Sequence, residues 1–509
     1  MSTSENNKRI AQNAFFLYLR MFLSMGVSLF TARVILQALG VEDFGIYNVV
    51  AGIVVLFSFI NGAMAIASQR FLSFAIGEGT QDKVGKVFSM SLTSHFFMAI
   101  IVLALAETIG LWIVGGMNFP IGRYDAAAWA YHFAVFTCII NVVRVPYNAA
   151  IIAYEKMSFY AWISIVEVFA KLGIAYSLMI YSGDKLIFYS FLLFLVTMLV
   201  NLIYKWYCNH LFSATKYHFF WDKSMFRQFV SFSGWSLAGS LANVGAQQGL
   251  TMILNLFCGV LVNAASGIAG QVTGAVGVFL SNFQTAFNPQ LVKSYASGDC
   301  EYFMNLIFKS SKFSYYLLFI ISLPVLINCS FFIDVWLGNV PQYAVEFTQL
   351  MVIFLLFDAI SGPLWVSVQA TGKIKNYQLL MSFLILLNLP VSYLLLKYGC
   401  SPIYVFVGRV VINIVTLFAR IVYLRPLIQL PARKFVIQVL FPILIVTAIS
   451  APLPIWLNGV WDISWHSVII ISLVAVLLSS VVIYIVGLTA GERIIVNKLV
   501  KNKLVSKIH

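Results

Sequence analysis

The chain has 509 residues, of which 61% are hydrophobic and only 10% are charged, and its formal net charge is +14. Soluble domains carry roughly 25% charged residues. The composition therefore excludes a water-soluble globular protein and favours an all-α integral membrane protein surrounded mostly by lipid. The positive charge does not call for a nucleic-acid partner, because basic loops beside an anionic inner leaflet account for it.

In chain order, the first apolar stretch runs from about residue 11 to 39 and follows Lys8 and Arg9. It lacks a cleavage site, so we expect it to be retained as a first span rather than removed as a signal peptide. A membrane helix needs about twenty apolar residues, and this length predicts fourteen spans. They cover about residues 12–38, 46–68, 88–114, 127–149, 157–181, 186–206, 229–255, 261–288, 313–336, 345–370, 377–397, 402–424, 434–457 and 466–488.

The basic residues between these spans are distributed very unequally. The tails and the loops after even-numbered spans hold 24 Lys and Arg residues, whereas the opposite loops hold only three, Arg123, Lys185 and Lys397. Loops rich in Lys and Arg stay in the cytoplasm. We therefore expect both termini to be cytoplasmic in a bacterial inner membrane. The basic tail 492–509 is expected to be either an interfacial helix or a solvated tail.

Two segments resemble each other at a separation of about 221 residues. FGIYNVVAGI (44–53) with SFAIGEG (73–79) matches SGIAGQVTGA (266–275) with SYASGD (294–299). Each unit would contain six spans, which predicts two lobes facing a central cleft. The predicted divisions are an N-terminal lobe (1–206), a cytoplasmic linker (207–228), a C-terminal lobe (229–424), spans thirteen and fourteen (425–491) and the basic tail.

Ionisable residues at membrane depth are costly unless they face protein or water, so they indicate a functional cavity. The chain has eight of them: Arg20, Arg33, Glu107, Arg144, Glu167, Lys171, Asp358 and Arg409. Five spans also carry polar residues on one helical face. These stripes are Asn13, Arg20, Ser24 and Thr31; Thr137, Asn141, Arg144 and Asn148; Tyr160, Ser164, Glu167 and Lys171; Ser236, Ser240, Asn243 and Gln247; and Arg409, Asn413, Thr416 and Arg420.

Several of these residues have a purely structural interpretation as well. Glu167 and Lys171 are spaced for a helix pair and would neutralise each other. The face of Asn243 and Gln247 is rich in glycine, which also suits helix packing. Arg33 points away from Arg20 and is either a residue of the outer mouth or one that reaches the headgroups.

Inside the predicted spans, five basic residues face three acidic ones. A cleft with this balance attracts anions, and the planar guanidinium of arginine matches phosphate oxygens. The six cysteines lie far apart without metal-site spacing, so we interpret them as reduced packing residues. Walker A, HExxH and GxSxG motifs are absent from the sequence, so neither an ATP engine nor a zinc or serine hydrolase is indicated.

Four segments resemble the Wzx-like polysaccharide flippases of the multidrug/oligosaccharidyl-lipid/polysaccharide exporter superfamily. They are LGVEDFGIYNVVAGI (39–53), ASQRFLSFAIGEG (67–79), VPYNAAIIAYEKMSFYAWISIVEVFAKLG (145–173) and FNPQLVKSYASGD (287–299). The resemblance covers the first twelve spans. It implies two six-helix bundles in a MATE-like V, with two extra C-terminal helices, and alternating access rather than enzymatic activity.

The resemblance further implies transport of a polyprenyl-diphosphate-linked oligosaccharide to the outer leaflet for surface polysaccharide synthesis. Membrane lipids and other polysaccharide assembly proteins are the expected partners; no cofactor is expected beyond coupling to protons or sodium. We expect Arg20, Arg144, Lys171 and Arg409 to hold the diphosphate, with Arg33 at the outer mouth. Neutral polar residues would accommodate the sugars: Asn13, Ser24, Asn141, Asn243, Gln247 and Asn413. Glu107, Glu167 and Asp358 are the candidates for ion coupling.

Three alternatives stay open at this point. A multidrug cation antiporter of the same superfamily normally uses membrane-buried acids, whereas the first span here has two arginines and no acid. A flippase for a lipid-linked peptidoglycan precursor shares the diphosphate chemistry. A membrane-embedded glycan polymerase or ligase usually has a large exported loop, which the predicted spans do not leave room for.

Overall fold

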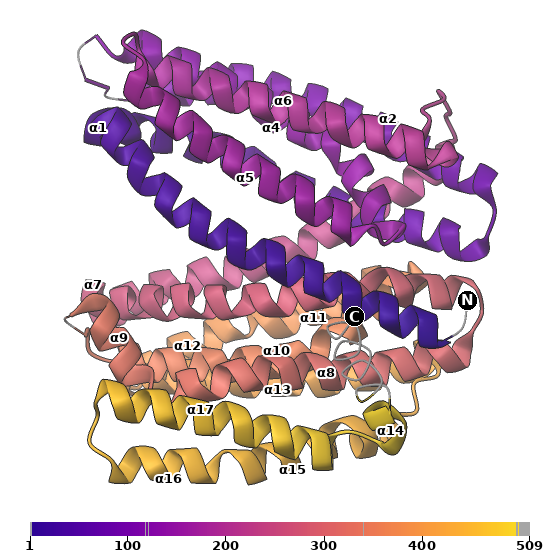
Figure 1. Cartoon of the computed structure of the whole chain (residues 1–509), viewed down its shortest axis with the longest axis vertical. Helices are drawn as coiled ribbons and strands as arrows, with labels where there is room; N and C mark the ends of the chain where they lie inside the picture. The colour runs from indigo at the N-terminus through magenta and orange to yellow at the C-terminus, as the bar shows by residue number, and fades with distance from the viewer. Residues whose placement is uncertain (1–2, 118, 121, 339, 495–496, 498–509) are drawn as a thin grey trace, which may run out of the picture. The chain divides into compact units, whose positions relative to one another are not determined.

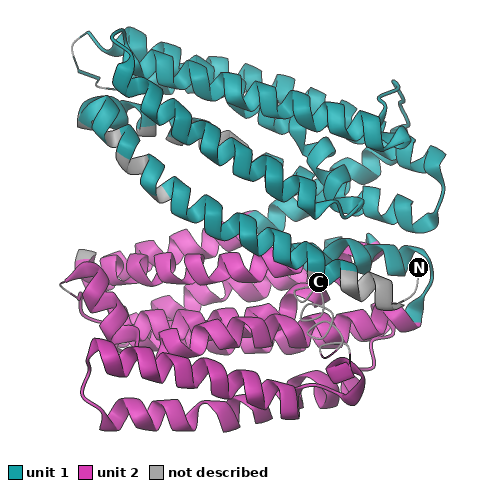
Figure 2. Ribbon diagram, in the orientation of Figure 1, with its two compact units in different colours: residues 1–240, 285–300, 372–378 teal, residues 241–284, 301–371, 379–509 magenta. Residues whose placement is uncertain are grey.

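The computed structural model of the chain describes residues 3–117, 119–120, 122–338, 340–494 and 497. For some helical residues, the structure describes the backbone but not the side chain: 3–8, 11, 29, 32–33, 36, 41, 48, 52–53, 55–60 and 260. The described residues are helical throughout, without a strand, as the composition predicts. Figure 1 shows the helices, and Figure 2 the two compact units into which they group.

Unit 1 comprises residues 1–240, 285–300 and 372–378. Its helices are α1 (Thr3–Glu78), α2 (Gln81–Leu105), the π-helical η1 (Ala106–Gly110), α3 (Leu111–Gly115), α4 (Tyr124–Ala153), α5 (Met157–Ile180), α6 (Lys185–Leu211) and the short η2 (Ser213–Thr215). Helix α7 (Lys223–Ala296) begins and ends in this unit. α4 lies between α1 and α6 and packs against both.

Unit 2 comprises residues 241–284, 301–371 and 379–509. Besides the middle of α7, it holds α8 (Cys300–Ile327), α9 (Cys329–Leu337), α10 (Ala344–Thr371), α11 (Lys375–Leu386), α12 (Asn388–Lys397), α13 (Pro402–Ile428), α14 (Ala432–Phe435), η3 (Val436–Leu440), α15 (Phe441–Ser450), α16 (Pro452–Val460), α17 (Trp465–Val482) and η4 (Ile483–Gly487). α10 packs along α13, where Phe347 stacks on Phe406 with ring centroids 4.0 Å apart.

Two helices are far longer than a membrane is thick, and each is interrupted at one glycine. α1 has 76 residues and α7 has 74; a straight helix of that length would extend over about 110 Å. The helical geometry breaks at Gly40 (φ 77°, ψ 170°) and at Gly259 (φ 79°, ψ −175°), a backbone region open essentially to glycine alone. The separation of the two glycines is close to the offset of the sequence repeat, so the two copies share this bend.

Among the described residues, eleven helical stretches are long and apolar enough to cross a membrane. They overlap the predicted spans three to six and eight to fourteen, although the predicted span 313–336 begins inside α8 and ends in α9. The predicted spans 12–38, 46–68 and 229–255 lie in α1 and in the first part of α7, which are helical but do not belong to the eleven. The chain is therefore a multi-pass helical protein, and the number fourteen stays a prediction, as do the predicted domain divisions.

The last helices form the outer layer of unit 2 beside α8 (Figure 1). Tyr316 donates a hydrogen bond to the carbonyl oxygen of Gly487 (3.3 Å). Lys312 of α8 pairs with Glu492 (2.7 Å), and their side chains are only 4% and 5% exposed. This buried pair fixes the start of the predicted basic tail; residues 495–496 and 498–509 of that tail lie outside the described residues.

A second ion cluster joins three elements of unit 1. Arg123, which precedes α4, pairs with Asp43 of α1 and with Asp184, both at 2.6 Å. Asp184 also caps α6 by accepting hydrogen bonds from the backbone N–H groups of Leu186 and Ile187. Burial alone would raise the pKa of Asp184, but the hydrogen bonds from Arg123 and Ile187 lower it below its ordinary value.

Candidate functional site

Unit 1 contains a cavity of about 470 Å³ along one face of α4. The whole polar stripe predicted for this helix lines it: Thr137, Asn141, Arg144 and Asn148. Residues three or four positions apart on a helix share a face, so one cavity contacts all four. Residues of α1 and α6 complete the wall, among them Tyr47, Asn61 and Ser190.

Three asparagine side chains that line this cavity have an amide oxygen that accepts no hydrogen bond from the described residues. The Oδ1 atoms of Asn61, Asn141 and Asn148 are buried and have no hydrogen-bond partner within the described part of the chain. A buried acceptor without a partner costs about 1–3 kcal/mol. A ligand that brings hydroxyl or amide donors into the cavity would recover that cost, and a purely apolar ligand would not.

Charged residues of α4 and α5 form a cluster in which two cations face one carboxylate. Arg144 lies 3.3 Å from one carboxylate oxygen of Glu167, and the Lys171 ammonium lies 2.8 Å from the other. Arg144 and Lys171 remain 23% and 41% exposed. The Glu167 carboxylate therefore pairs with both cations, and some N–H groups of Arg144 and Lys171 remain able to donate hydrogen bonds to a ligand.

Arg20, on α1, lies near the same cluster. Its guanidinium carbon lies 4.6 Å from the ring centroid of Tyr160, on the same face of α5 as Glu167. The Arg144 guanidinium lies 5.5 Å from the ring of Tyr204 on α6, and Tyr204 in turn interacts electrostatically with Arg20 and Tyr160. Cation–π contact weakly stabilises an arginine without neutralising it. Arg20 therefore lies close to the group of Arg144, Glu167 and Lys171, in which two cations share one carboxylate.

Arg20 lies beside the cavity on α4, and neither Arg20 nor the other described residues of the predicted α1 stripe form part of its lining. Asn13 is buried and Ser24 is half-buried, and neither lines the cavity on α4. The predicted outer-mouth residue, Arg33, has a side chain outside the described residues. The stripe of α1 is thus represented in the site by Arg20 alone.

Glu107 lies in the π-helical turn η1, where it contacts His132 of α4 (3.1 Å). The neighbouring Tyr131 donates a hydrogen bond to the carbonyl oxygen of Ala106 (2.7 Å). Glu107 is not among the residues that line the cavity on α4. The sequence does not predict the contact between Glu107 and His132, because no local pattern links positions 107 and 132.

Unit 2 contains two cavities, of about 570 Å³ and 210 Å³, and both are lined by Gln247 and Arg409. The larger is lined further by Thr251, Asn263, Ser266 and Gln271. The smaller is lined further by Asn243, Asp358, Asn388, Asn413, Thr416 and Arg420. The predicted stripe of α13 therefore faces one cavity, just as the stripe of α4 does in unit 1.

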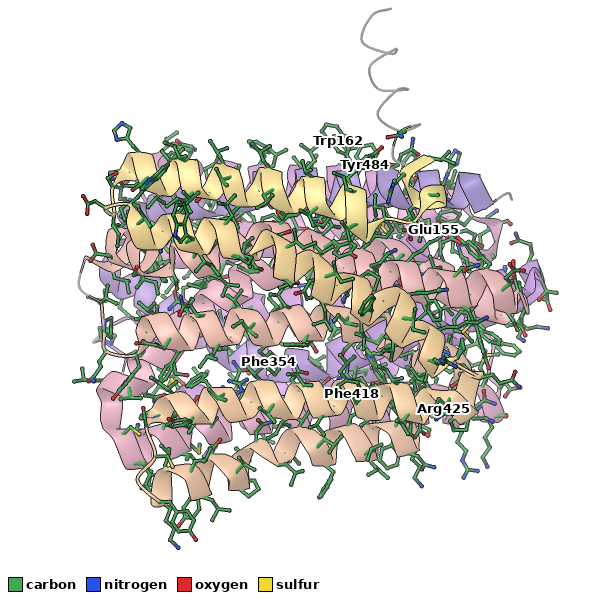
Figure 3. All side chains as sticks on the ribbon, turned by 90° about the horizontal axis from the view of Figure 1, so that it is seen from below. Glu155, Trp162, Phe354, Phe418, Arg425 and Tyr484 are labelled. Carbon is green, nitrogen blue, oxygen red and sulfur yellow. The ribbon has the colours of Figure 1, made fainter. Side chains whose placement is uncertain are left out.

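Among the described residues, the positive charge of Arg409 contacts aromatic rings rather than a carboxylate. Its guanidinium carbon lies 5.4 Å and 5.9 Å from the rings of Phe354 and Phe406; Figure 3 labels Phe354. Over the described ranges, no carboxylate lies within ion-pair distance of Arg409. Asp358, which lines the same cavity, interacts electrostatically with Arg420 instead.

Each copy of the sequence repeat lines a cavity, the first copy in unit 1 and the second in unit 2. Tyr47, Ala51 and Val54, in or beside the first copy, line the cavity of unit 1. Ser266, Gly267, Gly270 and Gln271 of the second copy line the larger cavity of unit 2. Each unit thus builds its cavity on the segment that follows its glycine bend.

Neither a scan of family models nor a search of curated proteins finds a match to this sequence. Solved structures do match. A multidrug resistance MATE family transporter of the MOP superfamily, in an outward-facing conformation, aligns with a TM-score of 0.70 at 12% identity over 84% of this chain and 98% of its own. The MATE transporter ClbM in complex with Rb⁺ aligns with a TM-score of 0.69 at 16% identity over 82% and 94%.

A third match is a MOP superfamily transporter from Pyrococcus furiosus, described as having a binding pocket of reverse polarity. Its TM-score is 0.67 at 14% identity, over 82% of this chain and 96% of its own. Identities this low establish the fold alone. The chain is a multi-pass membrane protein with the MATE transporter fold, as the sequence resemblance to this superfamily predicts.

Proposed function

We propose that this protein is a flippase that moves a polyprenyl-diphosphate-linked oligosaccharide across the bacterial inner membrane by alternating access. The observation that carries the proposal is the surplus of positive charge beside the cavity of unit 1. Arg144 and Lys171 share the single carboxylate of Glu167, and Arg20 lies over the ring of Tyr160 on the same helix as Glu167. A diphosphate would supply the missing negative charge and accept charge-assisted hydrogen bonds from the guanidinium groups.

The neutral lining of the cavities supports a sugar as the other part of the cargo. The unused amide oxygens of Asn61, Asn141 and Asn148 are acceptors for sugar hydroxyl groups. The cavities of unit 2 add Asn243, Gln247 and Asn413 from the predicted set, beside the uncompensated Arg409. The polyprenyl chain would remain in the bilayer, since its transfer into a polar cavity is unfavourable.

For ion coupling, Glu107 and Asp358 are the proposed carriers of a proton or sodium ion. Both are carboxylates within membrane-spanning helices, and neither is held by two cations as Glu167 is. We propose that Glu167 acts instead as the counter-ion that holds Arg144 and Lys171 in place. Replacing Glu107 or Asp358 by its amide should make transport less dependent on the pH gradient or sodium gradient.

The decisive experiment is reconstitution of the purified protein into liposomes that contain a fluorescent polyprenyl-diphosphate oligosaccharide. We expect the label to become accessible in the opposite leaflet at a rate that rises with protein content. A parallel arm with a lipid-linked peptidoglycan precursor separates the two kinds of flippase, and elongation of the glycan would identify a polymerase or ligase. Absence of leaflet exchange with either lipid would reject the proposal.

A multidrug cation antiporter is the second candidate because the solved neighbours include multidrug transporters. The charge at the cavity of unit 1 opposes it: an entering cation would meet Arg144 in the cavity wall, and the carboxylate beside Arg144 is already shared with Lys171. Uptake of a fluorescent organic cation into the same liposomes tests this directly. Cation transport without lipid exchange would favour the antiporter.

A further inference from the structure

One carboxylate of unit 1 is completely buried and lies away from the cavity on α4. Glu155 occupies the turn between α4 and α5 and has a side-chain exposure of 0%; Figure 3 labels it. Its oxygens contact Lys293 (2.5 Å) and Gln290 (2.7 Å) near the end of α7, and Arg9 (3.3 Å) near the start of α1. We call these four residues the Glu155 cluster.

The backbone at Glu155 is strained in a way that a glycine would relieve. Its φ is 60°, and the N–H groups of Tyr154 and Glu155 still bond to carbonyl oxygens of the last turn of α4. Glycine is the usual residue at such a left-handed position after a helix, and a bulky residue there costs roughly 1 kcal/mol or more. The chain therefore accepts strain in order to place a carboxylate at this point.

The cluster joins the two halves of the sequence. Arg9 also donates to the carbonyl oxygen of Tyr154 (3.0 Å), so the first helix is tied to the α4–α5 turn. Lys293 and Gln290 belong to the second copy of the sequence repeat and its flank. The charge distribution predicts that Arg9 and Lys293 lie on the cytoplasmic side. Within unit 1, the cluster therefore ties the end of α7 to α1 and to the α4–α5 turn, on the side that is predicted to be cytoplasmic.

A second close approach reinforces this connection. A Cβ atom added to Gly77, at the end of α1, would lie 2.8 Å from Cβ of Ala296 and 2.7 Å from the carbonyl oxygen of Lys293. Only glycine permits this packing. The last residues of α7 thus rest on unit 1, whereas residues 241–284 of the same helix belong to unit 2.

We propose that the Glu155 cluster is a cytoplasmic latch: its ion pairs hold the end of α7 on unit 1 while the cytoplasmic path is closed, and they break each time cargo enters from the inner leaflet. This inference rests on the alternating access of the proposed function. Breaking one partner of a buried pair leaves an uncompensated charge, so water or cargo must reach the cluster when the latch opens.

The first test closes the latch covalently. An E155C/Q290C pair in a C300S background, which removes the exposed native cysteine, replaces two side chains whose ends touch (2.7 Å) by thiols that a short, reducible bifunctional thiol reagent can bridge. Crosslinking should abolish lipid exchange, and a reductant should restore it. The control pair S68C/S91C joins α1 to α2 at side chains that already touch (2.8 Å), and its crosslinking should leave exchange unchanged. Full exchange by the crosslinked E155C/Q290C protein would overturn the latch.

The second test does not depend on the identity of the cargo. Ser294 of α7 is 4% exposed, so a cysteine placed there should react slowly with a membrane-impermeant thiol reagent in inside-out vesicles. Glu155→Gln should accelerate this labelling about tenfold by shifting the population toward the open state. Glu78→Gln, which removes the exposed partner of Lys83 at the same end of α1, should not change the rate.

The two tests separate failure of the latch from failure of the proposed function. Equal labelling in Glu155→Gln and in the parent protein would overturn the latch whatever the cargo is. Faster labelling without lipid exchange in the wild-type protein would support the latch and reject the flippase. Glu155→Lys combined with Lys293→Glu should return labelling toward the parent rate, because the pair is restored with reversed signs.

Discussion

The cavities of the two units differ in how their arginines are compensated. In unit 1, Arg144 shares the carboxylate of Glu167 with Lys171. In unit 2, Arg409 rests on two aromatic rings without a carboxylate partner in the described part of the chain. A shared counter-ion positions its cations and lowers their cost of burial, whereas ring contact does little of either. If the proposed cargo binds both cavities, we expect precisely oriented anion binding in unit 1 and a weaker, less oriented attraction in unit 2.

The largest effect should come from the cation that Glu167 positions in unit 1. We expect Arg144→Gln to lower the rate of lipid exchange about 100-fold, because a desolvated ion contact contributes about 2–5 kcal/mol. Arg144→Lys should lower it about tenfold, since the charge stays while the planar fork is lost. The exposed Arg425, changed to Gln, is the matched control and should retain the parent rate. Parent activity in a folded Arg144→Gln protein would remove the central support for a diphosphate cargo.

In unit 2, we expect removal of the charge of Arg409 to raise the stability of the protein and to lower its activity. Arg409→Gln removes a half-buried charge that no carboxylate offsets in the described part of the chain, so thermal unfolding of the detergent-solubilised protein should occur at a higher temperature. Lipid exchange should fall about tenfold, less than for Arg144→Gln. Lower stability in Arg409→Gln would show that the ring contacts compensate the charge, and the distinction between the units would then fail.

A smaller change should follow from removing the counter-ion of unit 1. Glu167→Gln raises the local positive charge, so the affinity for a soluble diphosphate analogue should increase about fivefold at low salt. Exchange should slow because release of the anion becomes harder. Isothermal titration with the analogue measures the first effect. Weaker binding in Glu167→Gln would mean that the position of the cations matters more than their net charge.

The smallest effect concerns the ion cluster at Arg123, outside both cavities. The pKa of Asp184 is lowered in the folded protein, so its stabilisation is present above the unfolded value of about 3.9 and is lost as the pH falls through the lower folded value. The unfolding temperature should therefore decrease by roughly 2 °C in that range. Arg123→Gln should lose this component of the pH dependence. An unchanged profile would show that Asp184 gains nothing from Arg123.

The sequence predicts those parts of the site that lie on one helix. Thr137, Asn141, Arg144 and Asn148 share a cavity because a helix repeats every 3.6 residues, and this period is visible in the sequence. The contact between Lys171 and Glu167 follows from the same period. For the same reason, the residues of the predicted α13 stripe, from Arg409 to Arg420, line one cavity.

Contacts between helices could not be predicted in this way. Arg144 of α4 pairs with Glu167 of α5, and Arg20 of α1 lies over the ring of Tyr160, also on α5. Asn13 and Arg20 share a helical face, yet neither lines the cavity on α4, because packing rather than periodicity decides which part of a long helix lines it. The buried role of Glu155 was also hidden, since its partners lie more than a hundred residues away.

The glycine bends at Gly40 and Gly259 have a mechanical consequence. A single non-helical residue connects the two arms of α1, and another connects those of α7. A connection this short has no slack, and a side chain at either position would be strained. Each pair of arms should therefore move as one stiff lever, so a displacement produced at one end of a lever would be transmitted to the other rather than absorbed at the joint.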